Sequence, residues 1–135
     1  MGALIDANVL IDHERGRIDL ASKLLGRRDE EYFLSVITVS ELLHGVHRAK
    51  DAVIRAKRST FVESVFLRFP ILPLDLATAR IHSQLWADLA AAGVVISPHD
   101  LWLAATCLAH DLTLVTRNVR EFERVPGLKI ESWMT

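Results

Sequence analysis

The stretch that decides the fold is SPHDLWLAATCLAHDLTLVTRN, residues 97–118. Its first half predicts a helix, because Ser97 can cap it, Pro98 is favoured at the first helical position, and apolar residues then recur at helical spacing. Its second half contains a short apolar run, residues 112–116, which predicts a strand. A helix that leads into a short buried strand is typical of a parallel sheet covered by helices on both faces.

The same alternation extends in both directions along the chain. Further strands are predicted at residues 3–5, 32–36, 71–72 and 128–130. Further helices are predicted from Thr38, over 49–68, from an Asp75 cap to Gly93, and as a short turn over 119–123. We therefore predict an α/β fold in which residues 1–135 form a single domain around a central, mostly parallel sheet.

Composition narrows the class of protein. Half of the 135 residues are apolar, and the formal net charge is -1, so overall charge argues neither for nor against nucleic-acid binding. The single cysteine, Cys107, excludes a disulfide within the chain and a cysteine-rich zinc site, and its apolar helical context predicts a core residue. No run of about 18 apolar residues and no signal-like opening is found, so we expect a cytoplasmic protein without a membrane anchor.

Polar residues stand where the predicted strands end and the next helices begin. Asp6 follows the first strand, Glu41 and Asp100 are predicted in the first turns of helices, and Asn118 follows the strand 112–116. Ligands of open α/β sheets bind at the carboxyl ends of the strands. We therefore predict that three carboxylates and one amide converge in one cleft.

Converging carboxylates repel one another, and a divalent cation removes that penalty. A ligand set of oxygens, without Cys or His, suits Mg²⁺, with Mn²⁺ as a possible substitute. Such an ion activates a bound water and stabilises charge on a phosphodiester. The pattern therefore favours metal-dependent phosphodiester hydrolysis.

Helix capping is an alternative role for each of these residues. Thr38 and Glu41 have the spacing of a capping box, as do Ser97 and Asp100 with a shorter acid. Asn118 also suits a helix cap, and Asp6 would serve as one if a helix began near Asn8. Local sequence alone leaves both roles open.

Three segments together resemble PIN domains. They are LIDANVLID (4–12), SVITVSELLHGV (35–46) and SPHDLWLAATCLAHDLTLVTRNVREFERVPGLKIESW (97–133), and they occur in the family's order over nearly the whole chain. The resemblance implies a three-layer α/β/α fold and Mg²⁺- or Mn²⁺-dependent RNA cleavage. It assigns the metal-site acids to Asp6, Glu41 and Asp100, with Asn118 in the fourth, Asp-or-Asn position.

The chain looks most like the VapC toxins of toxin–antitoxin pairs. That resemblance implies a homodimer, inhibition by a VapB-like antitoxin, and operator DNA contacted only through the antitoxin. An amide at Asn118 adds no charge, which favours one firmly bound metal. Asn8 and Thr116 are candidates for positioning water or phosphate, and Arg117 is a candidate phosphate ligand beside the site.

A second positive region lies in residues 48–58. It has five basic residues within eleven positions: Arg48, Lys50, Arg55, Lys57 and Arg58. Such a run can bind RNA phosphates, although a solvated helix face is the commoner role.

Two other classes of protein share parts of the pattern. A phosphoacceptor domain or an Asp-x-Asp phosphatase also has an α/β fold with Mg²⁺, but the first strand is followed here by Asp6 and then Asn8, not by two acids. A catalytically silent PIN fold, binding an antitoxin on operator DNA, is the non-enzymatic alternative. It would bind its partner without hydrolysing RNA.

Overall fold

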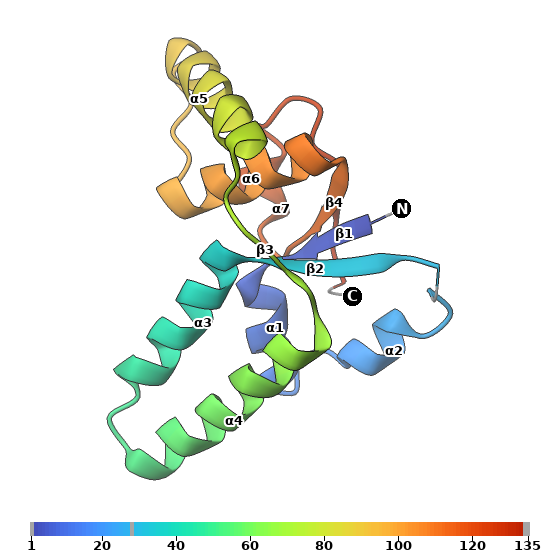
Figure 1. The fold of residues 1–135 in the computed structure, drawn as a ribbon, viewed down its shortest axis with the longest axis vertical. Helices are drawn as coiled ribbons and strands as arrows, with labels where there is room; N and C mark the ends of the chain where they lie inside the picture. The colour runs from blue at the N-terminus through green and yellow to red at the C-terminus, as the bar shows by residue number, and fades with distance from the viewer. Residues whose placement is uncertain (1, 28, 134–135) are drawn as a thin grey trace.

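The computed structural model describes residues 2–27 and 29–133. Within them the chain forms one five-stranded sheet between two layers of helices (Figure 1). The strands are β1 (Gly2–Ile5), β2 (Glu31–Ser35), β3 (Ile71–Leu72), β4 (Leu112–Val115) and β5 (Ile130–Glu131). The helices are α1 (Ala7–Glu14), α2 (Leu20–Leu24), α3 (Val36–Arg48), α4 (Ala52–Arg68), α5 (Leu76–Ala91), α6 (Pro98–His110) and α7 (Val119–Phe122).

The strand order β3-β2-β1-β4-β5 determines where the site forms. All four strand pairings are parallel, and Ile5 of β1 pairs with Val115 of β4. After β1 the chain continues to one side of the sheet, whereas β4 and β5 lie on the other side. The crevice between the ends of β1 and β4 is therefore the switch point at which open α/β sheets bind ligands.

Alternate side chains of the strands face two separate cores. Ile5 and Val115 pack with residues of α1–α4, whereas Leu4 and Leu114 pack with residues of α5–α7. Figure 1 shows these two helical layers on opposite sides of the sheet. The predicted α/β/α architecture is confirmed, and Cys107 is a buried core residue as predicted.

The start of α3 differs from the prediction. Ser35 caps this helix, with its Oγ accepting a hydrogen bond from the Ile37 amide at 3.0 Å. Val36 is therefore helical, and Thr38 is buried with no hydrogen-bond partner for its hydroxyl among the described residues. The predicted helix start at Thr38 and the alternative of a Thr38–Glu41 capping box are both wrong, and Glu41 lies in the second turn of α3.

Two smaller differences arise where local patterns are weak. The short helix α2 is absent from the sequence prediction, because its five residues show no repeated apolar spacing; Asp19 caps it. The last strand is Ile130–Glu131 rather than 128–130. In the part of the chain that the structure describes, no helix has the length and apolarity needed to cross a membrane.

Candidate active site

Asp6 lies at the switch point, between the ends of β1 and β4. Its backbone amide donates to the Val115 carbonyl at 2.9 Å, which ties the end of β1 to β4. The Asp6 side chain is only 4% exposed, and its Oδ2 accepts hydrogen bonds from Thr116 Oγ1 at 2.8 Å and Asn8 Nδ2 at 3.2 Å. Although Asp6 occupies the N-cap position of α1, its side chain makes no capping hydrogen bond. The carboxylate therefore belongs to the cleft and not to the helix end.

Thr116 and Asn8 connect the two loops that form the cleft. Besides donating to Asp6, Thr116 Oγ1 accepts hydrogen bonds from the Asn118 amide at 3.0 Å and from Asn8 Nδ2 at 3.4 Å. Asn8 Oδ1 accepts from the Arg117 amide at 3.1 Å. Three polar side chains thus fix the loop after β4 against the start of α1.

Arg117 is held in place by an acid that the sequence analysis did not single out. Its Nη1 donates to Asp12 Oδ1 at 2.7 Å, and Arg17 Nη1 reaches the same oxygen at 3.3 Å. The Asp12 side chain is fully buried, whereas the Arg117 side chain is 41% exposed. Spacing offered a signal, because Asn8 and Asp12 are four residues apart and share one face of α1.

Asn118 is at the N-cap of α7, but its side chain makes no capping hydrogen bond. Its backbone amide donates a hydrogen bond to Thr116 Oγ1, and the residue is exposed. The carboxamide therefore remains available at the rim of the cleft.

Glu41 and Asp100 reach the cleft from α3 and α6, and their charges act on Asp6. Burial raises the pKa of Asp6 from 3.8 to about 6; the Thr116 hydrogen bond opposes this rise, and the charges of Asp100 and Glu41 add to it. Burial likewise raises the pKa of both Glu41 and Asp100. The three predicted acids therefore form one electrostatic unit.

Two more charged residues border these acids. His99 Nδ1 lies 3.1 Å from Oε1 of Glu41, and this contact opposes the rise in the Glu41 pKa. Glu121 of α7 is close enough for its charge to contribute to the raised pKa of Asp100, after burial. His99 is next to Asp100 in the sequence, yet its side chain contacts Glu41 of α3.

Asp100 also takes part in capping. Its backbone amide donates to Ser97 Oγ at 3.3 Å, which is the predicted cap of α6. Ser97 therefore caps α6 and also lowers the pKa of the Asp100 carboxyl group by a side-chain hydrogen bond, while the charge of Asp100 acts on Asp6 and Glu41.

The cleft has the donor chemistry of a hard divalent cation. Its acids offer only oxygen atoms, and all three bear pKa values raised by burial, which a cation would reverse. In residues 2–27 and 29–133, no three His, Cys, Asp or Glu side chains form a group able to hold one ion. Mg²⁺ is compatible with this arrangement, because it usually keeps several waters and takes one or two carboxylates.

The PIN domain family matches residues 3–128. This chain belongs to the PIN domain family. The PIN match spans all the cleft residues described above, from Asp6 to Asn118.

Individual relatives of this PIN domain are VapC proteins. The chain is 32% identical to Ribonuclease VapC of Rickettsia bellii, over 96% of this chain and 95% of that protein. It is 29% identical to the tRNA(fMet)-specific endonuclease VapC of Salmonella typhimurium, over 96% of each chain. The structure resembles that of DNA-bound VapBC from Salmonella typhimurium with a TM-score of 0.89 and 28% identity, over 98% of both chains.

Proposed function

We propose that this PIN domain is a Mg²⁺-dependent endoribonuclease and the toxin of a toxin–antitoxin pair. The observation that carries the proposal is the buried Asp6 carboxylate, whose pKa is raised to about 6 at the switch point beside Glu41 and Asp100. Acids that raise one another's pKa repel one another when ionised, and a bound cation removes this repulsion. The cation can then bind and activate a phosphodiester. The similarity to VapC ribonucleases supports RNA as the substrate.

Asp6, Asp100 and Glu41 would hold the cation, directly or through its waters. When bound, Mg²⁺ or Mn²⁺ supplies Lewis-acid stabilisation and lowers the pKa of a water. Thr116 and Asn8 hold Asp6 Oδ2 in a fixed orientation through hydrogen bonds of 2.8 and 3.2 Å. Pre-set side chains of this kind lose little entropy when the substrate binds.

Arg117 and Asn118 would act on the substrate from the other side of the cleft. The Asp12 ion pair uses one guanidinium nitrogen of Arg117 and leaves others for a phosphate oxygen. The Asn118 carboxamide makes no capping hydrogen bond, so it can hydrogen-bond to RNA or to an ordered water. A positive group next to three acids also reduces the repulsion that an incoming phosphate meets.

The proposal extends to partners and cellular location. A VapB-like antitoxin would bind the protein and connect it to operator DNA, as the similarity to DNA-bound VapBC supports. A homodimer fits the apolar surface around α5, where Trp86 is 63% exposed and Val95 82% exposed. We place the protein in the cytoplasm, where RNA and an antitoxin would meet it.

A catalytically silent binding module is the second candidate. It would retain antitoxin binding and lack hydrolysis. The raised pKa of all three acids favours the nuclease, because a module without catalysis has no need of converging buried carboxylates. A phosphoacceptor domain would also need a lysine beside the cleft after its last strand. Lys129 does not fill this role, because it pairs with the exposed Asp111 at 3.0 Å, away from the cleft.

The experiment is cleavage of total cellular RNA by the purified protein with Mg²⁺, Mn²⁺ or EDTA. We expect discrete fragments with either metal and none with EDTA. Asp6→Asn and Asp100→Asn should give none under any condition, while circular dichroism shows a native fold.

Glu63→Gln is the matched control, because Glu63 is exposed on α4, outside the cleft. It should cleave like wild type. Intact RNA with folded wild-type protein and metal would shift the conclusion to the binding module. Labelling by a small phosphodonor would instead indicate a phosphoacceptor.

A further inference from the structure

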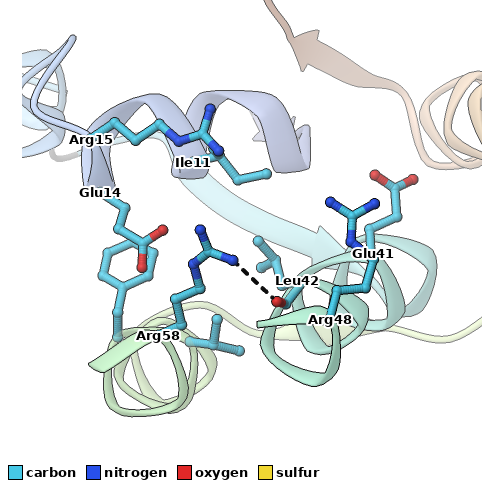
Figure 2. A pocket seen from close by; sticks show the side chains of 10 residues that line it. Ile11, Glu14, Arg15, Glu41, Leu42, Arg48 and Arg58 are labelled. Carbon is cyan, nitrogen blue, oxygen red and sulfur yellow. Dashed lines mark hydrogen bonds between the residues drawn. The ribbon is translucent and has the colours of Figure 1, made fainter. Parts of the chain in front are cut away.

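A second cleft, here called the basic cleft, lies between α1, α3 and α4. Arg15, Arg48 and Arg58 line it, and Gly45 is also among its lining residues (Figure 2 labels the three arginines). Figure 2 shows the Arg58 side chain rising from α4 into the space between the three helices. The cleft has a volume of about 80 Å³, which suits a small group better than a folded segment.

The basic cleft includes one acid of the candidate active site. Glu41 lines it, and a neighbouring hollow of about 510 Å³ shares Glu41, Gly45 and Arg48 and extends to His99. The two hollows therefore adjoin along α3, and together they extend from Glu41 and His99 to the three arginines.

The structure divides the basic run of residues 48–58 by role. Arg48 and Arg58 face the basic cleft. Arg55 instead donates to the Ala49 carbonyl at 3.0 and 2.6 Å, and so satisfies the end of α3. Lys57 is exposed and does not line the cleft. Arg15, the C-cap residue of α1, joins these two arginines from a distant part of the sequence.

The arginines of the basic cleft retain unused donors. In the part of the chain that the structure describes, no carboxylate lies within ion-pair distance of Arg15, Arg48 or Arg58. Arg58 uses one nitrogen on the Gly45 carbonyl at 3.3 Å, and a guanidinium has five N–H donors. Three positive charges around the cleft exceed the two carboxylates that line it, those of Glu14 and Glu41.

We propose that the basic cleft binds an RNA backbone phosphate that flanks the scissile one. This inference rests on the proposed ribonuclease function, because the same RNA strand would occupy both clefts along α3. Guanidinium groups bind phosphate oxygens in a bidentate manner, and such contacts position a strand without reading its sequence. Because the basic cleft shares Glu41 with the candidate active site, RNA is favoured over an acidic protein segment as the occupant.

The test measures RNA binding without cleavage. In the Asp6→Asn background with EDTA, the Kd of a single-stranded RNA oligonucleotide is measured over a range of salt concentrations. Arg15→Ala/Arg48→Ala should bind more weakly. The magnitude of the slope of log K against log salt should fall by about 0.7, because the basic cleft holds one phosphate and each phosphate of a single strand that the protein neutralises contributes about 0.7.

A control with the same loss of charge accompanies the double variant. Lys57→Ala/Arg80→Ala removes one charge from the same basic run, outside the cleft, and one exposed charge from α5 on the other layer. It should keep the salt slope of the parent. Equal loss in this control and in the test variant would overturn the proposal, because the effect would then be one of overall charge.

A steric variant tests the site with all charges kept. Nothing lies within 4 Å of a Cβ built on Gly45, so Gly45→Leu should fold and fill the hollow. We expect it to weaken RNA binding as well. Parental affinity in both Gly45→Leu and Arg15→Ala/Arg48→Ala would refute the proposal.

Two further outcomes separate this proposal from others. If the variants bind RNA normally but lose a protein partner, the basic cleft is a protein-binding surface and the proposal is wrong. If wild type binds RNA through the arginines yet never cleaves it with Mg²⁺, the ribonuclease function fails while the phosphate site stands.

Discussion

Arg117 and Asp12 form an ion pair of 2.7 Å in which the acid is wholly buried and the base is partly exposed. The second oxygen of Asp12 is buried without a hydrogen-bond partner among the described residues. The pair thus links α1 to the loop after β4 and holds the Arg117 guanidinium at the rim of the acidic cleft. Removing Asp12 would leave an arginine that water can solvate, whereas removing Arg117 would leave a carboxylate that water cannot reach.

Arg117→Ala should lower the free energy of unfolding by about 2 kcal/mol at neutral pH. This is below the roughly 3–5 kcal/mol for breaking a fully buried pair, because Arg17 still reaches Asp12 at 3.3 Å. Asp12→Asn should cost less, since the Arg117 left behind is solvated. Urea denaturation compares the two variants, and a larger loss for Asp12→Asn would contradict this account of the pair.

Stability without metal should depend on pH through Asp6. Its folded pKa of about 6 lies above the ordinary 3.8, so its contribution is fully present below about pH 3.8 and is lost as pH rises through about 6. The shift of the Asp6 pKa from 3.8 to about 6 corresponds to about 3 kcal/mol in the free energy of unfolding. Relative to wild type in EDTA, Asp6→Asn should therefore become more stable as pH rises, with about two thirds of the gain between roughly pH 4.5 and 7.5.

Urea denaturation of wild type and Asp6→Asn at several pH values measures this difference directly. Other titrating groups, such as His82, whose pKa burial lowers, are common to both proteins and cancel. A stability difference that stays constant with pH would show that Asp6 has an ordinary pKa.

Thr116→Val should move the acid limb of the RNA-cleavage pH profile upward by about one pH unit. The Thr116 hydrogen bond lowers the pKa of Asp6, and a hydrogen bond to a charged group contributes roughly 1.5 kcal/mol or more. Thr116→Ser keeps the donor and should keep the profile. An unchanged limb in Thr116→Val would mean that cleavage does not depend on the ionised form of Asp6.

Glu41→Gln should leave the free energy of unfolding within about 0.5 kcal/mol of wild type, because Glu41 lies in the second turn of α3 and caps nothing. The exposed contact between Glu41 and His99 contributes little to the free energy of unfolding, because water screens surface ion pairs. RNA cleavage should fall at least about tenfold, the scale on which altered metal-site neighbours act. Destabilisation of about 1 kcal/mol with full activity would restore the capping role.

Much of the fold could be predicted from local patterns. Apolar runs and helix signals such as Ser97-Pro98 identified the strand–helix alternation, and the parallel sheet follows from it. The patterns failed at α2, which is too short to show a period, and at the start of α3. There Ser35 and Thr38 are equally good caps by sequence, and burial of Thr38 in the tertiary structure decided between them.

By itself the sequence determined which chemistry is possible: Asp6, Glu41 and Asp100 at the ends of predicted strands and starts of helices, with oxygen donors alone. Only the tertiary structure decided which groups act on one another. Asp12 faces Arg117, His99 faces Glu41, and Arg15 joins Arg48 and Arg58, in each case across elements distant in the chain. The physical reason is that charge interactions and desolvation depend on separation and burial in space, and local sequence spacing sets these only within a single helix or strand.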